Sequence, residues 1–381
     1  MLKIVKNILL AGAMLTNITA FAGITPNPVA PSVGAKSYIL QDFASGRVIA
    51  ESNADERLPP ASITKLMTAY VISHELDAGN IKLDDEVLIS EKAWRMVGSR
   101  SFIEVNTKVP VEALLRGMII QSGNDAAVAL AEHVAGSEET FAQMMNQYAQ
   151  KLGMKDTNYS NSTGLPDPNH YTTARDIATL SAAIIRDFPD HYKWYAEKEY
   201  KYNDITQHNR NKLLWRDSSV DGLKTGHTEE AGYCLAASAI RDDMRLISVV
   251  LGTHSDNARA QETQKLLNYG FRFFETHELY PAMTEIADGR VWKGSDKQVQ
   301  LGLAKPLSVT VPRGRYKELV ASTNVQKPII APVAAGAELG EVEIRLGDEV
   351  IAKQHLVAIN AIEQGGWFSR LIDSILMLIW G

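Results

Sequence analysis

The sequence is poor in the residues that make cross-links, metal sites and nucleic-acid surfaces. It has one cysteine among 381 residues, so no internal disulfide can form. Its nine histidines are scattered rather than spaced as metal ligands. Lysine and arginine number 39 against 45 acidic residues, a formal net charge of -6, so no basic excess favours nucleic acid. We therefore expect no metal, no cofactor and no nucleic-acid partner.

The lone cysteine, Cys234, lies in an apolar run that is typical of a strand. Free cysteine is among the most frequently buried residue types and behaves as a small hydrophobic side chain. The sequence therefore predicts a buried thiol rather than a nucleophile. Stability in an oxidising compartment then has to come from the apolar core.

The beginning of the chain carries a targeting pattern. Lys3 and Lys6 precede an apolar run from Ile8 to Ile18, and Ala20-Phe21-Ala22 has the small-x-small pattern of a signal-peptidase site. Residues 1–22 are therefore expected to be a signal peptide, and the protein is expected to be exported. The remaining length is sufficient for two domains and an appendage.

Residues 23–274 are expected to form an α+β domain on an antiparallel sheet, because strand-like runs from both ends flank a helical block. Runs expected to form strands are Lys36–Asp42, Arg47–Glu51, Glu86–Ile89, Ser101–Val105, Glu199–Tyr202, Lys212–Trp215, Gly232–Ile240 and Arg245–Leu251. Runs expected to form helices are Val111–Ile120, Asp125–Val134, Phe141–Leu152, Ala174–Arg186 and Glu262–Phe274. Thr173 is a suitable N-cap for the fourth of these helices.

The pattern of apolar and polar residues changes after about residue 275. Residues 275–366 hold short alternating runs separated by glycine or proline turns, which predict a small all-β domain. Residues 367–381 follow Gly365-Gly366 and gather polar side chains on one side and apolar ones on the other. This tail is shorter than the ~20 residues that cross a bilayer as a helix. It predicts an amphipathic helix that lies in a membrane surface, with docking on its own domain as the alternative.

Ser62 and Lys65 stand one helical turn apart, just after Pro59 and Pro60. Proline suits the first turn of a helix, so we expect a helix to open there. At this separation the lysine amine can reach the serine hydroxyl. Such pairs also occur in ordinary solvated helices, so the pair alone does not establish a catalytic site.

Two further short motifs follow in order. Ser122-Gly123-Asn124 falls between two predicted helices, where glycine permits a turn and two polar side chains can face a cavity, although an ordinary interhelix turn has the same signature. Lys224-Thr225-Gly226 precedes His227 in a strand-like region. Each motif is weak evidence for a catalytic site by itself. The three are informative because they occur together in one chain that is expected to be exported.

The three motifs resemble those of the penicillin-recognising serine acyltransferases. Within that group the chain resembles the low-molecular-mass D-alanyl-D-alanine carboxypeptidases of the penicillin-binding protein 5 and 6 type. The resemblance covers nearly the whole chain, including Asn209-Arg210-Asn211, the β domain and the C-terminal anchor. It implies a serine β-lactamase/DD-peptidase-like fold for the first domain.

The resemblance also implies roles for particular residues. Ser62 is the expected nucleophile, Lys65 its base, Ser122 a proton relay and Asn124 a contact to the substrate peptide. The backbone N–H groups of Ser62 and His227 are the expected oxyanion donors. The substrate's terminal carboxylate is expected to meet Lys224, Thr225, Gly226, His227 and Arg210, with Arg259 as a weaker candidate.

The chemistry of these residue types supports the first two roles. A serine hydroxyl needs a base, and no Ser-His-Asp arrangement is evident, which leaves Lys65. A lysine acts as a base only if its pKa falls towards neutrality. We expect burial and a second cation, Lys224, to lower the pKa of Lys65, while Lys224 itself stays charged. Thr163-Gly164 stands where relatives often have His-Gly, so no role of that histidine can be transferred.

The expected function is serine-type removal of the terminal D-alanine from peptidoglycan pentapeptides on the periplasmic side of the inner membrane. β-Lactam antibiotics are expected to acylate Ser62. A serine β-lactamase is one alternative, but the sequence lacks the Glu-x-x-Leu-Asn loop that supplies its deacylating base. A DD-endopeptidase and a non-catalytic wall-binding protein are the others. Intact Ser62, Lys65 and Lys224 argue against the non-catalytic alternative.

Overall fold

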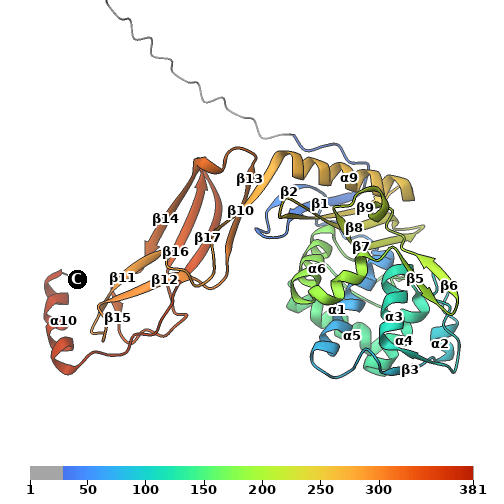
Figure 1. Ribbon diagram of the computed structural model, residues 1–381, viewed down its shortest axis with the longest axis horizontal. Helices are drawn as coiled ribbons and strands as arrows, with labels where there is room; N and C mark the ends of the chain where they lie inside the picture. The colour runs from blue at the N-terminus through green and yellow to red at the C-terminus, as the bar shows by residue number, and fades with distance from the viewer. Residues whose placement is uncertain (1–28, 381) are drawn as a thin grey trace, which may run out of the picture.

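We describe a computed structural model of the protein, in which residues 29–380 are described. The expected signal peptide, residues 1–22, lies outside them. Figure 1 shows a first domain of sheet and helices, a separate β domain, and a terminal helix at the far end of the β domain. The predicted α+β class and the all-β second domain are confirmed.

The first domain is built on one antiparallel sheet of five strands in the order β2-β1-β9-β8-β7. Its pieces come from both ends of the domain. The strands are β1 (Ser37–Asp42), β2 (Val48–Ser52), β7 (Val220–Thr228), β8 (Gly232–Arg241) and β9 (Met244–Thr253). Because β7 lies at the edge of the sheet, the strand carrying the Lys-Thr-Gly motif has one side free of strand partners.

Helices cover both faces of this sheet. The main helices of the first domain are α1 (Lys65–Asp77), α3 (Val111–Arg116), α4 (Asn124–Ala135), α5 (Glu138–Lys151), α6 (Ala174–Asp187) and α9 (Asp256–Phe273). Ile247 and Val249 of β9 pack into the core shared with the helical block, whereas Leu246 and Val250 pack with α9 on the opposite face. Strand side chains alternate between faces and both faces are covered, so the central strands are mostly apolar.

Short elements connect these pieces. They are the 3-10 turns η1 (Ala61–Thr64) and η3 (Lys193–Ala196), the π-helical turn η2 (Gly117–Gln121), and the helical turns α2 (Glu91–Trp94), α7 (Pro189–Tyr192) and α8 (Leu213–Arg216). Two short antiparallel strand pairs join them: β3 (Glu86–Leu88) with β4 (Lys108–Pro110), and β5 (Glu199–Tyr202) with β6 (Ile205–His208). Two strand predictions are wrong. Lys212–Trp215 contains the start of α8, and Ser101–Val105 is irregular.

The second domain packs its own apolar core between a six-stranded sheet and a two-stranded one. The sheet order is β14-β16-β17-β12-β11-β15, and β10 pairs with β13. The elements are β10 (Phe274–Tyr280), β11 (Ala287–Trp292), β12 (Gln298–Leu303), β13 (Leu307–Pro312), η4 (Tyr316–Glu318), β14 (Leu319–Val325), β15 (Ile329–Ile330), β16 (Glu338–Leu346) and β17 (Glu349–Ala358). Polar bonds join it to the first domain, including Thr276 Oγ1 to Asp42 Oδ2 at 2.8 Å.

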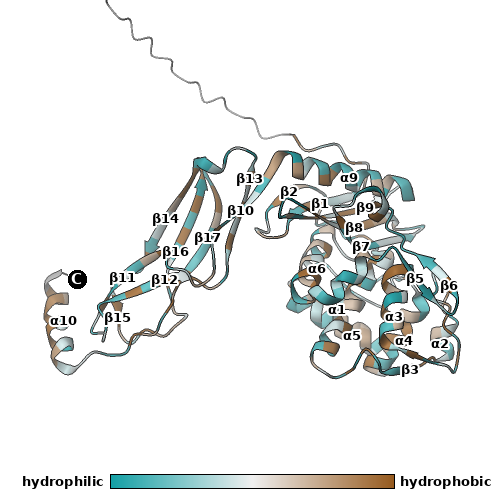
Figure 2. Ribbon diagram, in the orientation of Figure 1, coloured by the Kyte–Doolittle hydropathy of each residue, from teal (hydrophilic) through white to brown (hydrophobic). Residues whose placement is uncertain are grey.

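The chain ends in α10 (Trp367–Trp380), whose polar side docks on the β domain. Asp373 is only 3% exposed and accepts hydrogen bonds from Lys297 Nζ at 2.9 Å and from the Lys293 backbone N–H at 2.6 Å. Figure 2 shows the apolar character of this helix. Within residues 29–380, no helix combines the length and the apolar character required to cross a membrane.

Candidate active site

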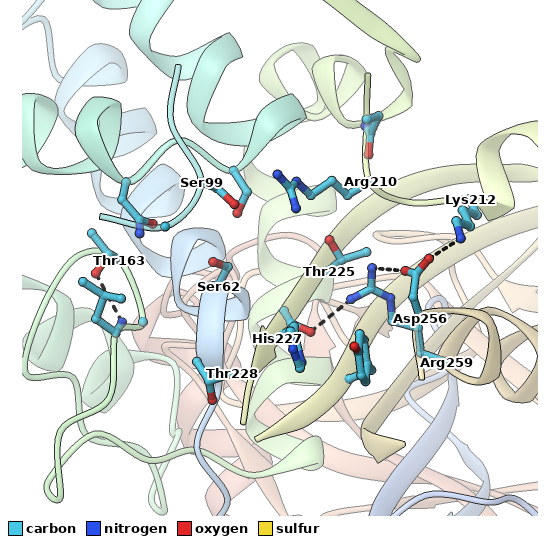
Figure 3. A pocket seen from close by; sticks show the side chains of 18 residues that line it. Ser62, Ser99, Thr163, Arg210, Lys212, Thr225, His227, Thr228, Asp256 and Arg259 are labelled. Carbon is cyan, nitrogen blue, oxygen red and sulfur yellow. Dashed lines mark hydrogen bonds and ion pairs between the residues drawn. The ribbon is translucent and has the colours of Figure 1, made fainter. Parts of the chain in front are cut away.

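A cavity of about 620 Å³ opens beside the edge strand β7, and it brings together most of the predicted site residues. Figure 3 shows the labelled side chains around it. The predicted residues that line it are Ser62, Ser122, Asn124, Arg210, Thr225, Gly226, His227 and Arg259. Lys65 and Lys224 lie immediately behind the wall, at 1% and 2% exposure. Segments far apart in the sequence therefore meet in one site.

Ser62 lies on η1, and α1 begins only at Lys65. The expected helix after the prolines therefore starts with a tighter 3-10 turn, in which the Ile63 N–H donates to Pro60 O at 3.2 Å. Ala61, the residue before the serine, has a left-handed φ of 47°. That conformation is costly for a residue with a side chain and marks a constrained turn at the serine.

Lys65 is the residue that connects the motifs. Its Nζ donates to Ser62 Oγ at 3.0 Å, to Asn124 Oδ1 at 2.7 Å and to the Thr163 carbonyl at 2.6 Å. Burial lowers the pKa of Lys65 to about 7; Asp125 opposes this change and Arg210 reinforces it. A substantial fraction of the amine is therefore neutral near pH 7, as a general base requires.

Ser122 and Asn124 sit where α3 passes through η2 into α4. Ser122 adopts a left-handed conformation with φ 71°, and its buried Oγ has no hydrogen-bond partner among the described residues. Asn124 contacts other protein groups, because its Oδ1 accepts from Lys65 and its Nδ2 donates to Val97 O at 2.6 Å, while its contact to the substrate stays a prediction. Both ends of this amide thus hold protein groups, and Asn124 positions Lys65 in the structure.

Gly226 allows β7 to approach the serine turn. A Cβ at this position would lie 2.9 Å from Pro60 O and 3.2 Å from Ala61 Cβ, so a side chain would push the strand away. His227 follows, with Nδ1 3.1 Å from Gly232 O and its ring stacked on Tyr233 at 3.9 Å between centroids. The imidazole is therefore held against the protein rather than beside Ser62.

Lys224 is buried close to three other cationic side chains. Burial, together with Lys65, Arg210 and Arg259, lowers its pKa well below the ordinary lysine value. Arg210 also lowers the pKa of Lys65, and Lys65 and Lys224 disfavour each other's charged forms. That Lys224 stays charged remains a prediction. An arriving carboxylate would favour its charged form.

Arg210 is exposed and has no hydrogen bond or ion pair with another described residue. Figure 3 shows its side chain directed over the pocket. The flanking asparagines fix the backbone: Asn209 Nδ2 donates to Glu197 O at 3.0 Å, and Asn211 Nδ2 donates to Gly222 O at 2.9 Å. The Asn-Arg-Asn pattern therefore presents one unpaired guanidinium to the cavity.

Several lining residues were missed because they belong to no short motif. They are Gly98, Ser99, Leu165, Lys212, Thr228, Tyr233 and Asp256. Among them, Asp256 pairs with both Lys212 and Arg259, and Arg259 Nη1 donates to Gly226 O at 3.1 Å. Within residues 29–380, Asp256 is the only acidic residue that lines the pocket, and it is already paired. The buried state of Cys234 is confirmed, and burial raises its pKa to about 11.

A buried lysine beside a serine, on an α+β scaffold whose edge strand borders the cavity, places the protein among the serine enzymes that penicillin recognises. The chain belongs to the D-alanyl-D-alanine carboxypeptidase family, whose model matches residues 25–255. Residues 274–364 match the penicillin-binding protein 5 C-terminal domain. The resemblance inferred from the motifs is confirmed.

Relatives and solved structures agree with this assignment. The chain is 46% identical to D-alanyl-D-alanine carboxypeptidase DacC of Escherichia coli, over 94% of this chain and 92% of that protein. Penicillin-binding protein 5 from Haemophilus influenzae superposes with a TM-score of 0.86 at 43% identity, covering 88% of this chain and all of that one. The ampicillin-bound penicillin-binding protein D2 from Listeria monocytogenes gives 0.59 at 30% identity, covering 63% of this chain and all of that one.

Proposed function

We propose that this serine-type carboxypeptidase removes the terminal D-alanine from peptidoglycan pentapeptides through an acyl ester on Ser62. One observation carries the proposal: Lys65 Nζ lies 3.0 Å from Ser62 Oγ and is fully buried. Neutral Lys65 can take the hydroxyl proton while Oγ attacks the carbonyl carbon of the scissile D-Ala-D-Ala bond.

The reaction then proceeds in two halves. Collapse of the tetrahedral intermediate breaks the C–N bond, and the leaving amine of D-alanine takes a proton from Lys65 through Ser122. The backbone N–H groups of Ser62 and His227 stabilise the oxyanion. In the second half, water gives a proton to Lys65, attacks the ester carbon and regenerates the Ser62 hydroxyl.

The excess of unpaired positive charge in the pocket supports a substrate with a free C-terminal carboxylate. Arg210 is unpaired, and Lys224 Nζ donates only to Thr225 O, at 3.2 Å. A D-Ala-D-Ala peptide with an amidated C-terminus should therefore lose about 10²-fold in kcat/KM for D-alanine or D-alaninamide release. The ratio of kcat/KM for the free acid to kcat/KM for the amide should be smaller in Arg210→Gln than in the wild type. Equal turnover of acid and amide would contradict this assignment.

β-Lactams should acylate the same serine, and the resulting acyl ester should hydrolyse slowly. Fast deacylation needs a carboxylate base, and the only acid that lines the pocket, Asp256, is held by Lys212 and Arg259. This observation disfavours a β-lactamase. The ampicillin-bound relative supports β-lactam binding in this pocket.

We further propose that α10 attaches the exported protein to the periplasmic face of the inner membrane. With Asp373 turned into the β domain, the outward side of the helix exposes large apolar side chains: Trp367, Phe368, Leu371, Ile372, Ile375 and Leu378 are between 43% and 88% exposed. An exposed apolar helix face flanked by tryptophan suits a lipid interface. Figure 1 places it at the end of the molecule remote from the catalytic domain.

Deletion of residues 367–381 should move the protein from the membrane to the soluble fraction while kcat/KM on small soluble peptides changes less than about twofold, because no residue of α10 lines the active-site pocket. Fractionation and peptide turnover, measured on the same preparations, test this result. Retention in the membrane fraction after deletion would contradict the anchor. Loss of peptide turnover would assign the helix a structural role instead.

A further inference from the structure

The amine of Lys65 needs a defined orientation to act as a base. A neutral lysine amine has two N–H donors and one lone pair. Two of its three neighbours, Asn124 Oδ1 and the Thr163 carbonyl, can only accept. When both accept an N–H, the lone pair is left for the hydroxyl proton of Ser62. The Thr163 carbonyl therefore helps to direct the base at the nucleophile.

That carbonyl belongs to a loop that has no regular secondary structure. Asn161 organises the loop from within. Its Oδ1 accepts from the Thr163 N–H at 3.1 Å, from Thr163 Oγ1 at 3.0 Å and from the Gly164 N–H at 2.8 Å, while its Nδ2 donates to Leu165 O at 3.0 Å. One side chain thus satisfies the polar groups on both sides of the Thr163 carbonyl.

The turn formed by Thr163 and Gly164 packs closely against the turn that carries Ser62. Gly164 has φ 83°, and a Cβ there would lie 1.8 Å from Ala61 O, so only glycine fits. Below it, Thr68 Oγ1 donates to Ser162 O at 2.7 Å. Contacts on two sides therefore hold the turn in place, and Asn161 fixes the direction of the Thr163 carbonyl between these contacts.

The side chain of Thr163 takes part in the turn rather than in the chemistry. Its Oγ1 donates to Asn161 and accepts from the Leu165 N–H at 3.2 Å, a bond drawn in Figure 3. Only the backbone of Thr163 reaches Lys65. Threonine in place of the histidine of some relatives therefore leaves this contact intact.

We propose that Asn161 is a positioning residue for acylation, which holds the Thr163 carbonyl so that the lone pair of Lys65 faces Ser62. The proposal rests on the proposed role of Lys65 as the base. It goes beyond that role by assigning a function to a residue that touches neither the substrate nor the reacting atoms.

The test is the second-order rate constant for acylation by a fluorescent penicillin, measured from pH 5 to pH 9 together with thermal stability. Asn161→Ala should acylate about 10²-fold more slowly than the wild type because the base is misdirected. Its pH midpoint should fall, since a lost carbonyl acceptor had favoured the charged amine. Asn161→Asp keeps the acceptor oxygen and adds a negative charge, so its midpoint should rise.

The matched control is Asn158→Ala, which removes the bond from Asn158 Nδ2 to Asn169 O, of 2.6 Å, at the base of the same loop. This variant should lose stability without a change in the pH midpoint. An unchanged rate and midpoint in Asn161→Ala would overturn the proposal. So would a loss of stability and rate, with the midpoint fixed, equal to that of the control.

If Asn161→Ala does not fold, Asn161→Asp alone decides, and an unshifted midpoint in it overturns the proposal. A wild-type profile without a midpoint near 7 would instead remove the premise that Lys65 is the base. Failure of this proposal and failure of the base assignment are thus distinguishable.

Discussion

Replacement of Ser62 by alanine should lower the release of D-alanine from a D-Ala-D-Ala peptide by at least about 10³-fold, mainly in kcat. Ser62 Oγ is the hydroxyl that Lys65 contacts at 3.0 Å, and burial lowers the pKa of that lysine to about 7. A second serine of the pocket, Ser122, has a buried Oγ without a hydrogen-bond partner among the described residues. No second nucleophile is thus prepared to replace Ser62.

Ser99→Ala is the matched control for this variant, because Ser99 lines the same pocket and contributes its backbone carbonyl to the Asn124 N–H at 2.8 Å. That backbone contact survives the substitution. We expect a change of only a few-fold in kcat/KM. Substantial D-alanine release by Ser62→Ala, within about tenfold of the wild type, would exclude an acyl ester on this serine.

Acylation should be about 100-fold slower at pH 5 than at pH 9 if the group that must lose its proton has a pKa of about 7. The sign follows from the base: burial lowers the pKa of Lys65 from 10.5 to about 7, and below that pH the amine is protonated and cannot accept the Ser62 proton. The rate should then fall tenfold for each further pH unit. A pH profile of acylation by a fluorescent penicillin measures this limb.

His227→Asn tests the other candidate base in the pocket wall. Among the described residues, His227 is the only histidine that lines the pocket. The variant should lower the rate but keep the midpoint near 7, because the imidazole is stacked on Tyr233 and does not contact Ser62. Disappearance of the acidic limb in this variant would assign the base to His227.

The rate should also fall at alkaline pH, so the pH profile should have an alkaline limb as well as the acidic one. Lys224 must be charged to meet the substrate carboxylate, and burial beside Lys65, Arg210 and Arg259 lowers its pKa. Deprotonation of Lys224 therefore weakens substrate binding at a lower pH than an ordinary lysine would. Lys65 and Lys224 interact, so the two limbs belong to the coupled pair.

The core strands were predictable because their burial is encoded locally. Arg245–Leu251 is mostly apolar, and the structure buries its alternate apolar side chains against the helical block and against α9. The helix over Ala174–Arg186 was also predictable, since Thr173 caps it by accepting from the Asp176 N–H at 3.1 Å. In both cases pattern and packing agree.

The wrong strand predictions arose where tertiary contacts decide the backbone. Ser101–Val105 has an apolar, β-branched composition, yet Asp125 binds its N–H groups, with Ser101 N to Oδ1 at 2.8 Å. Those donors are therefore unavailable to a ladder. In Lys212–Trp215, the preceding Asn211 accepts from the Leu213 N–H at 3.1 Å and starts a helical turn.

The site was predictable as far as its residues form short motifs, which covers Ser62, Lys65, Ser122, Asn124 and Lys224. What the motifs did not contain was the electrostatics and the supporting contacts. The ion pair between Asp256 and Lys212 joins residues 44 positions apart, so no local sequence pattern predicts it. The role of Asn161 depends on a loop that meets Lys65 only in the folded chain.

The central claim is that Ser62 carries the acyl group, and peptide mapping by mass spectrometry tests it most directly. The intact protein is incubated with penicillin, quenched and digested. The account predicts a mass increase equal to the whole penicillin, persisting over minutes and confined to the peptide that contains Ser62. An adduct on another residue, or complete turnover of penicillin without an adduct, would contradict it.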